Sequence, residues 1–431
     1  MKIAIAGYGI EGQASYRYYV QDPSNEITIF DQNPDFKGPD GVNTVVGHDA
    51  FENLQGYDLV LRTPAIAPNL IHTDGKVWSG TNEFFAKSPA PIIGVTGTKG
   101  KGTTSSMIAS ILEAAGKKVW LVGNIGTAAI DLLPEIKADD IVVYELSSFQ
   151  LWDIQSSPHI AVILPIEPDH LNIHYDMEDY VAAKGSIRRF QKAGDICIYH
   201  PSNSYAAQIA ALTAEAPKKR YAISEDGGVY VKDNAFHTGE QIICSTDIMQ
   251  VAGQHNIENA CAAASVALEL GISFQAISEG LMNFKGLPHR IEFVRVVNGV
   301  EYYNDSFSSA PGASVAAIKS FENPEIIVLG GIDRGADFSE LIKTIAEHKN
   351  VKELVLIGKI RHKLNDLLSA AGLETTITVF DGRTMPEIVD YLASRAQSGD
   401  AVILSPACAS FDMFRDFKDR GDQFRALVNE L

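Results

Sequence analysis

The stretch PIIGVTGTKGKGTT, residues 91–104, decides the fold, because it joins a buried apolar strand to a glycine-rich loop and then to a helical segment. Glycines let backbone N–H groups wrap around a phosphate, and a helix N-terminus adds a favourable dipole. Lys101 supplies positive charge for the terminal phosphates, and Thr103, with Thr104 as the alternative, supplies a hydroxyl for Mg²⁺. The stretch therefore predicts an ATP-binding loop made of Gly97, Thr98, Lys99, Gly100, Lys101, Gly102, Thr103 and Thr104.

The loop departs from the common pattern G-x-x-x-x-G-K-[ST] at both ends. The opening glycine falls on Val95, and Gly102 takes the place of the Ser or Thr. A glycine-rich turn that binds no ligand is the alternative. The order of strand, loop, lysine and hydroxyls favours ATP binding.

Three polar residues follow downstream, at strand ends or on a helix. Glu145 ends the strand of DIVVYELSSFQL, where a carboxylate is well placed for Mg²⁺. His170 follows the strand of IAVILPIEPDHLNIH, and a hydrogen-bonded structural histidine is the alternative to a ligand. Lys184 lies in the helical pattern DYVAAKGSIRRF, where the pattern alone favours a solvated lysine.

The opening IAIAGYGIEGQ, residues 3–13, has the outline of a dinucleotide-binding unit. Its glycines follow G-x-G-x-x-G, and the next apolar run ends on Asp31. A nicotinamide or flavin site is one interpretation, and a tight strand-to-helix turn is the other.

Apolar strand patterns alternate with helical patterns along the chain, which predicts an α/β protein with mostly parallel sheets. A length of 431 residues indicates two or three domains. AKSPAP (86–91) and FKGLPHR (284–290) interrupt the alternation. They predict domains at residues 1–89, 90–287 and 288–431, with ligands at the carboxyl ends of strands such as EIIVLGG and AVILSPA.

Composition excludes several classes of protein. A net charge of −18 opposes binding to nucleic acid or to an acidic membrane surface. No apolar run approaches the roughly 20 residues that span a bilayer, and the start has no signal-peptide pattern. The four cysteines form no CxxC pair, which indicates buried thiols rather than disulfides or zinc.

Ten ordered stretches resemble the Mur ligases, and GLPHR and SPACAS resemble their D-glutamate-adding branch. The stretches are TGTKGKGTT (96–104), GNIG (123–126), ELSSFQL (145–151), PDHL (168–171), YVAAK (180–184), GQHNIENA (253–260), GLPHRIE (286–292), NDS (304–306), GGIDRGADF (330–338) and LSPACASFDMF (404–414).

The resemblance implies a fold of three α/β domains: a Rossmann-like domain for the UDP-sugar, a central P-loop ATPase domain and a C-terminal Rossmann-like domain for the amino acid. The implied reaction joins D-glutamate to UDP-MurNAc-L-Ala through an acyl phosphate, with ATP and two Mg²⁺ ions, in peptidoglycan synthesis. It also implies a cytoplasmic monomer.

The resemblance assigns roles around the nucleotide. Lys101 would hold the γ-phosphate, Thr103 and Glu145 one Mg²⁺, and His170 the second. Lys184 matches a lysine that carries a CO₂-derived carbamate and helps to position that metal, which reverses the solvated interpretation. Asn259 matches an adenine contact, and Arg290 and Asp305 flank the nucleotide.

The resemblance also assigns substrate contacts. Gly9, Ile10, Glu11 and Asp31 would meet the UDP group, with Asp31 at the uracil, and Asn124 and Ser148 the muramoyl-alanine end. Ser410, Phe417 and Arg334, the last in place of a lysine, would receive the glutamate side-chain carboxylate. Ser309 stands for a threonine of the amino-acid site.

Several positions depart from the family pattern. Phe307 replaces an active-site lysine, and Glu11 replaces a small hydroxyl residue at a helix N-terminus, where its charge would repel a pyrophosphate. Either Glu11 points away from the pyrophosphate or the substrate sits differently. These departures leave open another amino acid such as L-glutamate, a folylpolyglutamate synthase, or an inactive nucleotide-binding regulator; an NAD-dependent oxidoreductase is the remote alternative.

Overall fold

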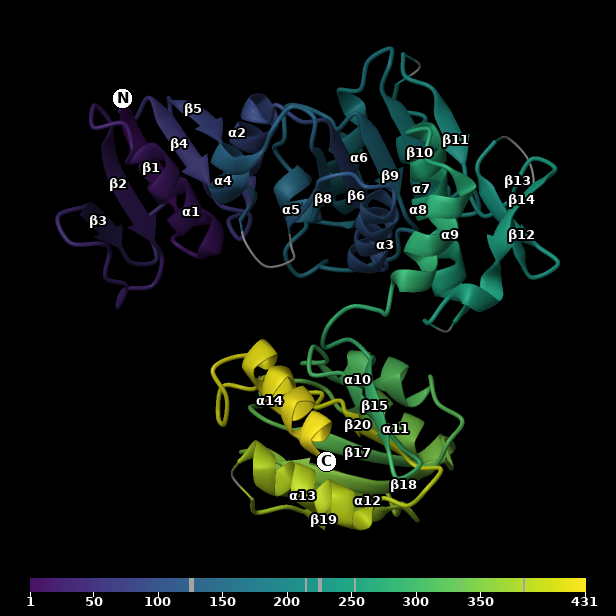
Figure 1. Ribbon diagram of the computed structural model, residues 1–431. Coiled ribbons are helices and arrows are strands. Elements are labelled where there is room, and N and C mark those ends of the chain that lie inside the picture. Colours follow the sequence, from purple (N-terminus) through teal and green to yellow (C-terminus); the bar gives the residue numbers. More distant parts are fainter. Residues whose placement is uncertain (124–127, 214, 224–226, 252, 334, 383) are drawn as a thin grey trace. The chain divides into compact units, whose positions relative to one another are not determined.

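The computed structural model describes residues 1–123, 128–213, 215–223, 227–251, 253–333, 335–382 and 384–431. The chain forms two compact units, Met1–Phe284 and Lys285–Leu431, both built from helices and mainly parallel sheets (Figure 1). This confirms the predicted α/β class. The division into three domains stays a prediction.

The first unit begins with a five-stranded parallel sheet in the order β3-β2-β1-β4-β5. Its strands are β1 (Lys2–Ala6), β2 (Glu26–Asp31), β3 (Asn43–Val46), β4 (Leu59–Arg62) and β5 (Lys76–Trp78), with helices α1 (Ile10–Tyr19) and α2 (Gly80–Lys87). β1 is central because its apolar side chains are buried from Ile3 to Ala6. The predicted strand, glycine turn and helix are therefore β1, residues 7–9 and α1.

The second sheet of this unit has six parallel strands in the order β11-β10-β9-β6-β8-β7. They are β6 (Ile92–Thr96), β7 (Val119–Gly123), β8 (Ile141–Glu145), β9 (Ile160–Ile163), β10 (Ile196–Tyr199) and β11 (Lys218–Arg220). Every residue of β6 is buried, as expected for a strand covered on both faces. The phosphate loop therefore starts from the interior of the sheet.

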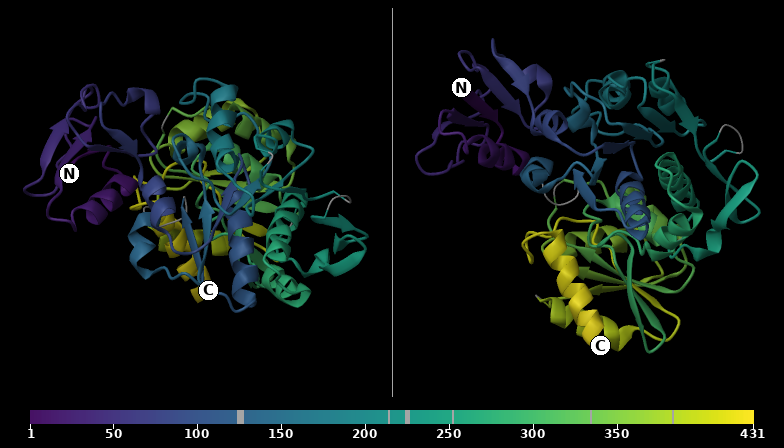
Figure 2. Two further views of the ribbon diagram at one scale, coloured as in Figure 1. Left: turned by 90° about the horizontal axis from the view of Figure 1, so that it is seen from above. Right: turned by 45° about the horizontal axis from the view of Figure 1, so that its top comes forward.

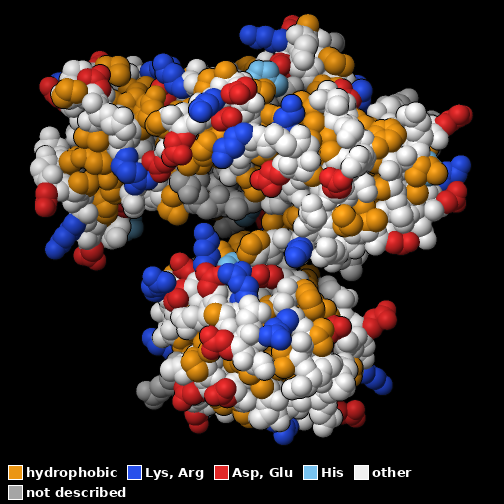
Figure 3. All heavy atoms as spheres, in the orientation of Figure 1, with side chains coloured by type: hydrophobic (Ala, Val, Ile, Leu, Met, Phe, Trp, Pro, Cys, Tyr) orange, Lys and Arg blue, Asp and Glu red, His pale blue; other side chains and the backbone are white. Residues whose placement is uncertain are grey.

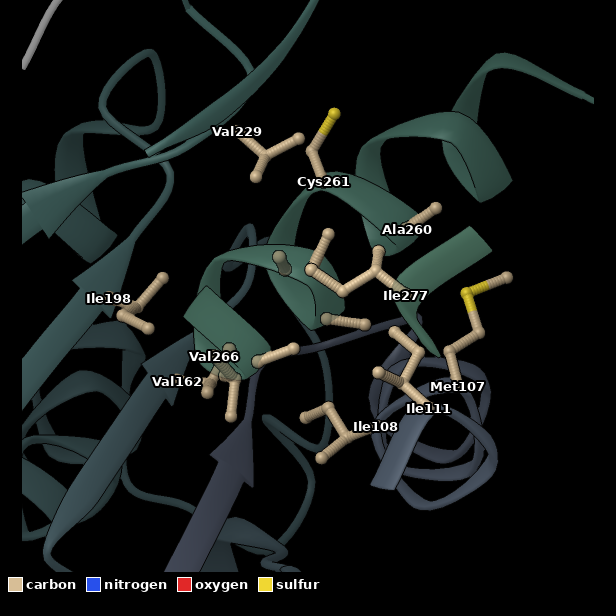
Figure 4. Close-up of a cluster of buried hydrophobic side chains, with 14 of the residues drawn as sticks. Met107, Ile108, Ile111, Val162, Ile198, Val229, Ala260, Cys261, Val266 and Ile277 are labelled. Atoms are coloured by element: carbon tan, nitrogen blue, oxygen red, sulfur yellow. The ribbon is translucent and has the colours of Figure 1, made fainter. Parts of the chain in front are cut away.

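Helices cover both faces of this second sheet. One face packs against α3 (Lys101–Ala114), α8 (Gln254–Glu269) and α9 (Phe274–Asn283). Figure 4 shows part of this core, where Met107 and Ile111 of α3 lie near Ile277 of α9 and Ala260 of α8. The other face packs against α4 (Ala129–Leu132), α5 (Ser148–Leu151), α6 (Met177–Arg189) and α7 (Ser204–Ala210).

A small antiparallel sheet completes the first unit: β12 (Val229–Lys232), β13 (Ala235–Thr238) and β14 (Gln241–Ser245). Figure 2 shows it at the opposite end of this unit from the first sheet. Val229 and Phe236 anchor it in the core beside α8. The sequence pattern does not predict this sheet, because its strands are short and only one face is apolar.

The second unit holds a six-stranded sheet in the order β15-β16-β20-β17-β18-β19, in which only β15 runs antiparallel to its neighbour. The strands are β15 (Glu292–Val297), β16 (Val300–Asn304), β17 (Glu325–Gly330), β18 (Val351–Ile357), β19 (Thr376–Val379) and β20 (Ala401–Leu404). The strands expected in EIIVLGG and AVILSPA are β17 and β20.

Helices cover both faces of this sheet as well. α10 (Pro311–Ile318), α11 (Ser339–Glu347) and α12 (Arg361–Ala370) pack on one face, and α13 (Met385–Arg395) and α14 (Phe417–Glu430) on the other. Among the described residues of the whole chain, no helix has the length and apolar character that crossing a membrane requires.

Candidate active site

The phosphate loop leaves β6 through two glycines in the left-handed region. Gly97 has φ 153°, and a side chain there would come within 2.6 Å of the Cβ atom of Leu164. Gly100 has φ 82° and caps α3. The loop is therefore shaped by positions that other residues would strain, and the first turn of α3 opens toward it.

Lys101 turns back over this loop. Its Nζ atom donates to the carbonyl oxygens of Gly97, at 3.1 Å, and Thr98, at 2.9 Å. Thr98 is fixed in turn, because its hydroxyl contacts Glu167 and lies 3.1 Å from the Tyr180 hydroxyl. The ammonium group of Lys101 thus lies at the loop, within reach of a phosphate bound there.

The two threonines at the start of α3 differ. Thr104 is fully buried, and its hydroxyl donates to Oδ1 of Asn259 at 3.2 Å. Thr103 is partly exposed. This favours Thr103 over Thr104 for Mg²⁺, and it places Asn259 beside the loop through a contact that the sequence pattern did not indicate.

Glu145 ends β8, the strand beside β6 in the sheet. It pairs in register with Val95 of β6, the strand that leads into the phosphate loop, and is 6% exposed. A carboxylate is thereby held at the end of the strand beside β6, where the sequence places it, and its contact with Mg²⁺ stays a prediction.

Lys184 is 1% exposed, so the solvated interpretation is wrong. Its Nζ atom donates to the carbonyl oxygen of Gly97 at 2.9 Å and lies 4.6 Å from the centre of the Tyr180 ring. Burial lowers the pKa of Lys184 well below its ordinary value, and the nearby charge of Lys101 acts in the same direction. The structure therefore brings a readily deprotonated amine to the phosphate loop.

His170 lies in a left-handed turn with φ 55°, and its side chain is 46% exposed. Nε2 lies 3.5 Å from Oδ2 of Asp169. Burial lowers the pKa of His170, helped by the charges of Lys184 and Lys101 and opposed by Asp169. A neutral imidazole is the form that binds metals.

His174 lies beside the site residue Ser148 and was not predicted from the sequence. It is 2% exposed, and its two ring nitrogens contact the Ser148 hydroxyl, at 3.0 Å, and Asp179, at 2.9 Å. Its ring stacks on Phe149. The available signal was its spacing of four residues from His170, whose carbonyl oxygen accepts the His174 N–H.

Ser148 is 2% exposed and uses its hydroxyl for His174. Its expected contact with the muramoyl-alanine group stays a prediction. Asn124 and Arg334, also expected at substrates, lie outside the described residues.

The opening loop lies at the carboxyl end of β1. Gly9 and Ile10 are exposed, and the Asp31 carboxylate accepts the Tyr8 N–H at 3.0 Å. Glu11 accepts a hydrogen bond from Nε2 of Gln150 on α5 at 3.2 Å. Glu11 therefore points to α5, the first of the two alternatives, and burial raises its pKa.

The second unit gathers Arg290, Asp305 and Phe417 around the end of β16. Asp305 is 2% exposed, and its carboxylate accepts from the Ile291 N–H, at 3.1 Å, and the Ser405 hydroxyl, at 2.7 Å. Burial raises the pKa of Asp305 to about 6. Ser309 is exposed on the same loop.

The Ser410 side chain, expected at the glutamate carboxylate, is buried at 2% exposure. Nearby, Arg420 was not predicted; it is 1% exposed, donates to Ser306 and to the Cys408 carbonyl, and has its pKa lowered by burial to about 10. It holds together the loops that carry Phe307 and Ser410.

The donor set suits Mg²⁺ bound jointly with phosphates. Among the described residues, no three His, Cys, Asp or Glu side chains cluster as a self-contained metal site. A partly exposed Thr103 hydroxyl and the Glu145 carboxylate at one phosphate loop match the few protein oxygens that Mg²⁺ takes beside ATP.

Two family models match the chain: "Mur ligase middle domain" over residues 95–267 and "Mur ligase, glutamate ligase domain" over residues 289–408. The UDP-N-acetylmuramoylalanine–D-glutamate ligase of Clostridium kluyveri is 34% identical over 100% of this chain and 97% of its own length. The ligase of that name from Acetivibrio thermocellus is 36% identical over 100% and 96%.

Solved structures share the fold. UDP-N-acetylmuramate-alanine ligase MurC from Thermotoga maritima has a TM-score of 0.60 at 17% identity, covering 100% of this chain and 99% of that one. Folylpolyglutamate synthase from Thermotoga maritima also has a TM-score of 0.60 at 17% identity, covering 78% and 90%. These similarities establish the fold but do not choose between the two activities.

Proposed function

The chain belongs to the Mur ligase family and is an ATP-dependent ligase, and from this premise we propose that it joins D-glutamate to UDP-N-acetylmuramoyl-L-alanine in peptidoglycan synthesis. The observation that carries the proposal is the full-length similarity to ligases of that name. The convergence of Lys101, Lys184 and Glu145 at one phosphate loop supports it. The same full-length similarity to ligases argues against a nicotinamide site in the opening loop.

The chemistry requires two anions to meet. The alanyl carboxylate attacks the γ-phosphorus of ATP, which forms an acyl phosphate and releases ADP. The amine of D-glutamate then adds to the acyl carbon, and the tetrahedral intermediate expels phosphate and leaves the amide. Lys101 offsets charge on the transferred phosphate, and backbone N–H groups of the loop and α3 orient it.

Mg²⁺, when bound, neutralises charge on the triphosphate and so lets the carboxylate approach. Thr103 and Glu145 would hold one ion, and His170 a second. Asn259, Arg290 and Asp305 would contact the nucleotide, and Ser410, Phe417, Ser309 and Arg334 the amino acid.

Lys184 acts in this proposal as a carbamate. A neutral amine adds to CO₂ and loses one proton, so a buried neutral group becomes an anion near the phosphate loop. The burial that lowers its pKa supplies the neutral amine that the addition needs. The carbamate would then help to position the second Mg²⁺.

The function is tested by phosphate release from ATP, with UDP-MurNAc-L-Ala and D-glutamate each omitted in turn. We expect turnover only when both are present, and almost none in Lys101→Ala because charge on the γ-phosphate is then unopposed. Faster turnover with L-glutamate would assign L-glutamate in place of D-glutamate as the amino-acid substrate. Turnover with tetrahydrofolate and glutamate would indicate a folylpolyglutamate synthase, and ATP binding without any turnover an inactive regulator.

The carbamate is tested with Lys184→Ala. We expect loss of activity that short carboxylates such as acetate or formate partly restore, because they replace the missing anion. Mass spectrometry of trapped carbamate on the wild type gives an independent measurement. Full activity of the plain variant would contradict the role.

We place the enzyme in the cytoplasm as a monomer that binds small molecules. Figure 3 shows Lys and Arg interspersed with Asp and Glu on the face drawn, unlike the continuous basic surface of nucleic-acid-binding proteins. Light scattering on the purified protein tests the monomer.

A further inference from the structure

Phe307 is a half-exposed aromatic residue in a loop that is otherwise fixed by hydrogen bonds. Its ring is 45% exposed, although Asp305, Ser306 and Ser308 around it are buried. The Phe307 N–H donates to the His289 carbonyl at 2.9 Å, and the Ser306 hydroxyl donates to the Phe417 carbonyl at 2.8 Å. These hydrogen bonds fix the backbone that carries the ring, while the ring itself stays half exposed to solvent.

The guanidinium of Arg290 lies over this ring, with its central carbon 4.5 Å from the ring centre. The ring of Phe417 meets Phe307 edge-on, with centres 5.1 Å apart and an interplanar angle of 89°. Arg290 therefore lies on a ring that is itself packed against a second aromatic side chain. A planar guanidinium suits such stacking better than an ammonium group does.

The backbone around Arg290 is strained. His289 has φ 63° and Ile291 has φ 45°, and the latter is costly for a β-branched residue. Hydrogen bonds hold the turn: the His289 N–H donates to Glu292 at 2.8 Å, and the Ile291 N–H donates to Asp305 at 3.1 Å. Both the chain and the ring beneath it thus fix where Arg290 points.

We propose that Phe307 is a positioning residue, whose ring holds the Arg290 guanidinium ready to bind an oxyanion of the reactants. The resemblance assigns Arg290 to the nucleotide and expects a lysine at 307; in this chain position 307 instead supplies an aromatic face on which Arg290 lies. The oxyanion is either a phosphate of ATP or a carboxylate of the incoming amino acid. The inference rests on the proposed function only where the oxyanion is the carboxylate of the amino acid. In the test below, the phosphate and the carboxylate are called its two arms.

The test compares Phe307→Leu, which keeps apolar bulk but removes the aromatic face, with Phe307→Tyr, which keeps that face. We expect Phe307→Leu to weaken binding of the oxyanion about two- to tenfold, and Phe307→Tyr to bind it as tightly as the wild type does. Titration with a non-hydrolysable ATP analogue reports the phosphate arm, and KM for D-glutamate reports the carboxylate arm.

A double-mutant cycle separates positioning from general damage. In an Arg290→Ala background, Phe307→Leu should cause no further loss, because the ring no longer has a cation to hold. The matched control is Phe293→Leu, at a 51% exposed phenylalanine of β15 in the same unit, which should leave both quantities unchanged. Additive losses, or a Phe307→Leu variant like the wild type in both arms, would overturn the proposal.

NMR of the arginine side chains gives a readout that needs no turnover. Ring currents should shift the Arg290 signals in the wild type and in Phe307→Tyr, and the shift should vanish in Phe307→Leu. Unmoved Arg290 signals would refute the stacking even if the enzyme proves to use another substrate. Absence of D-glutamate-dependent turnover with shifted signals would instead refute the proposed function alone.

Discussion

Asp305 is a carboxylate that the second unit keeps from water, and burial raises its pKa to about 6. Because the folded protein holds this proton more tightly than the unfolded chain, Asp305 contributes stability that is present below about pH 4 and lost as the pH rises through about 6. Asp305→Asn should remove this pH-dependent loss of stability, because an amide does not ionise in this pH range. We expect the variant to gain stability relative to the wild type between pH 4 and 7, by up to about 3 kcal/mol.

Urea unfolding at several pH values measures this difference. The introduced amide keeps one accepting oxygen and replaces the other by an NH₂ group, so one of the hydrogen bonds from Ile291 and Ser405 must change. That change is independent of pH, so the way the stability difference varies with pH, and not its absolute size, reports the charge. Parallel stability curves for the two proteins would contradict the assignment.

At the scale of an element, the start of α3 depends on Gly100. Its φ of 82° is unfavourable for other residues, and a Cβ atom there would come within 2.6 Å of Oδ1 of Asn259. Gly100→Ala should lower stability by about 1–2 kcal/mol through the left-handed backbone. It should also raise KM for ATP several-fold, because Asn259 must move from Thr104 and the loop.

Gly116 provides the control for this prediction. It has φ 72°, follows α3, and has open space where a Cβ would lie. Gly116→Ala should therefore carry the same backbone cost without the clash at Asn259, and it should leave KM for ATP unchanged. Equal KM values in the two variants would show that only backbone strain matters at Gly100.

At the scale of the first unit, the two parallel sheets are joined by polar contacts from distant parts of the chain. Arg62, at the end of β4, is 1% exposed and pairs with Asp153 at 2.6 Å. It also donates to the carbonyl oxygens of Ile66 and Phe149. Together with the bond between Glu11 and Gln150, this fixes the opening loop against the region that follows β8.

The sequence predicted what local patterns control. The phosphate loop, Glu145 at a strand end and the alternation of strands and helices follow from glycine spacing and apolar periodicity. Lys184 shows the limit, since its helical pattern favours solvent and only the packing of α6 beneath the loop buries it. Arg62 could not be predicted, because its partners are set by tertiary contacts rather than by spacing. For His174 the sequence offers only the spacing of four residues from His170, and its contacts with Ser148 and Asp179 depend on the fold.

The buried Arg62 also has a consequence for synthesis of the protein. β1 to β5 are complete before Asp153 and Phe149 leave the ribosome, so Arg62 begins without the carboxylate and the carbonyl oxygen that accept its hydrogen bonds. A charged group left unpaired in the interior is strongly unfavourable. The carboxyl end of β4 therefore becomes fully stable only after α5 and Asp153 emerge, and a nascent chain cut near residue 90 would keep Arg62 in water.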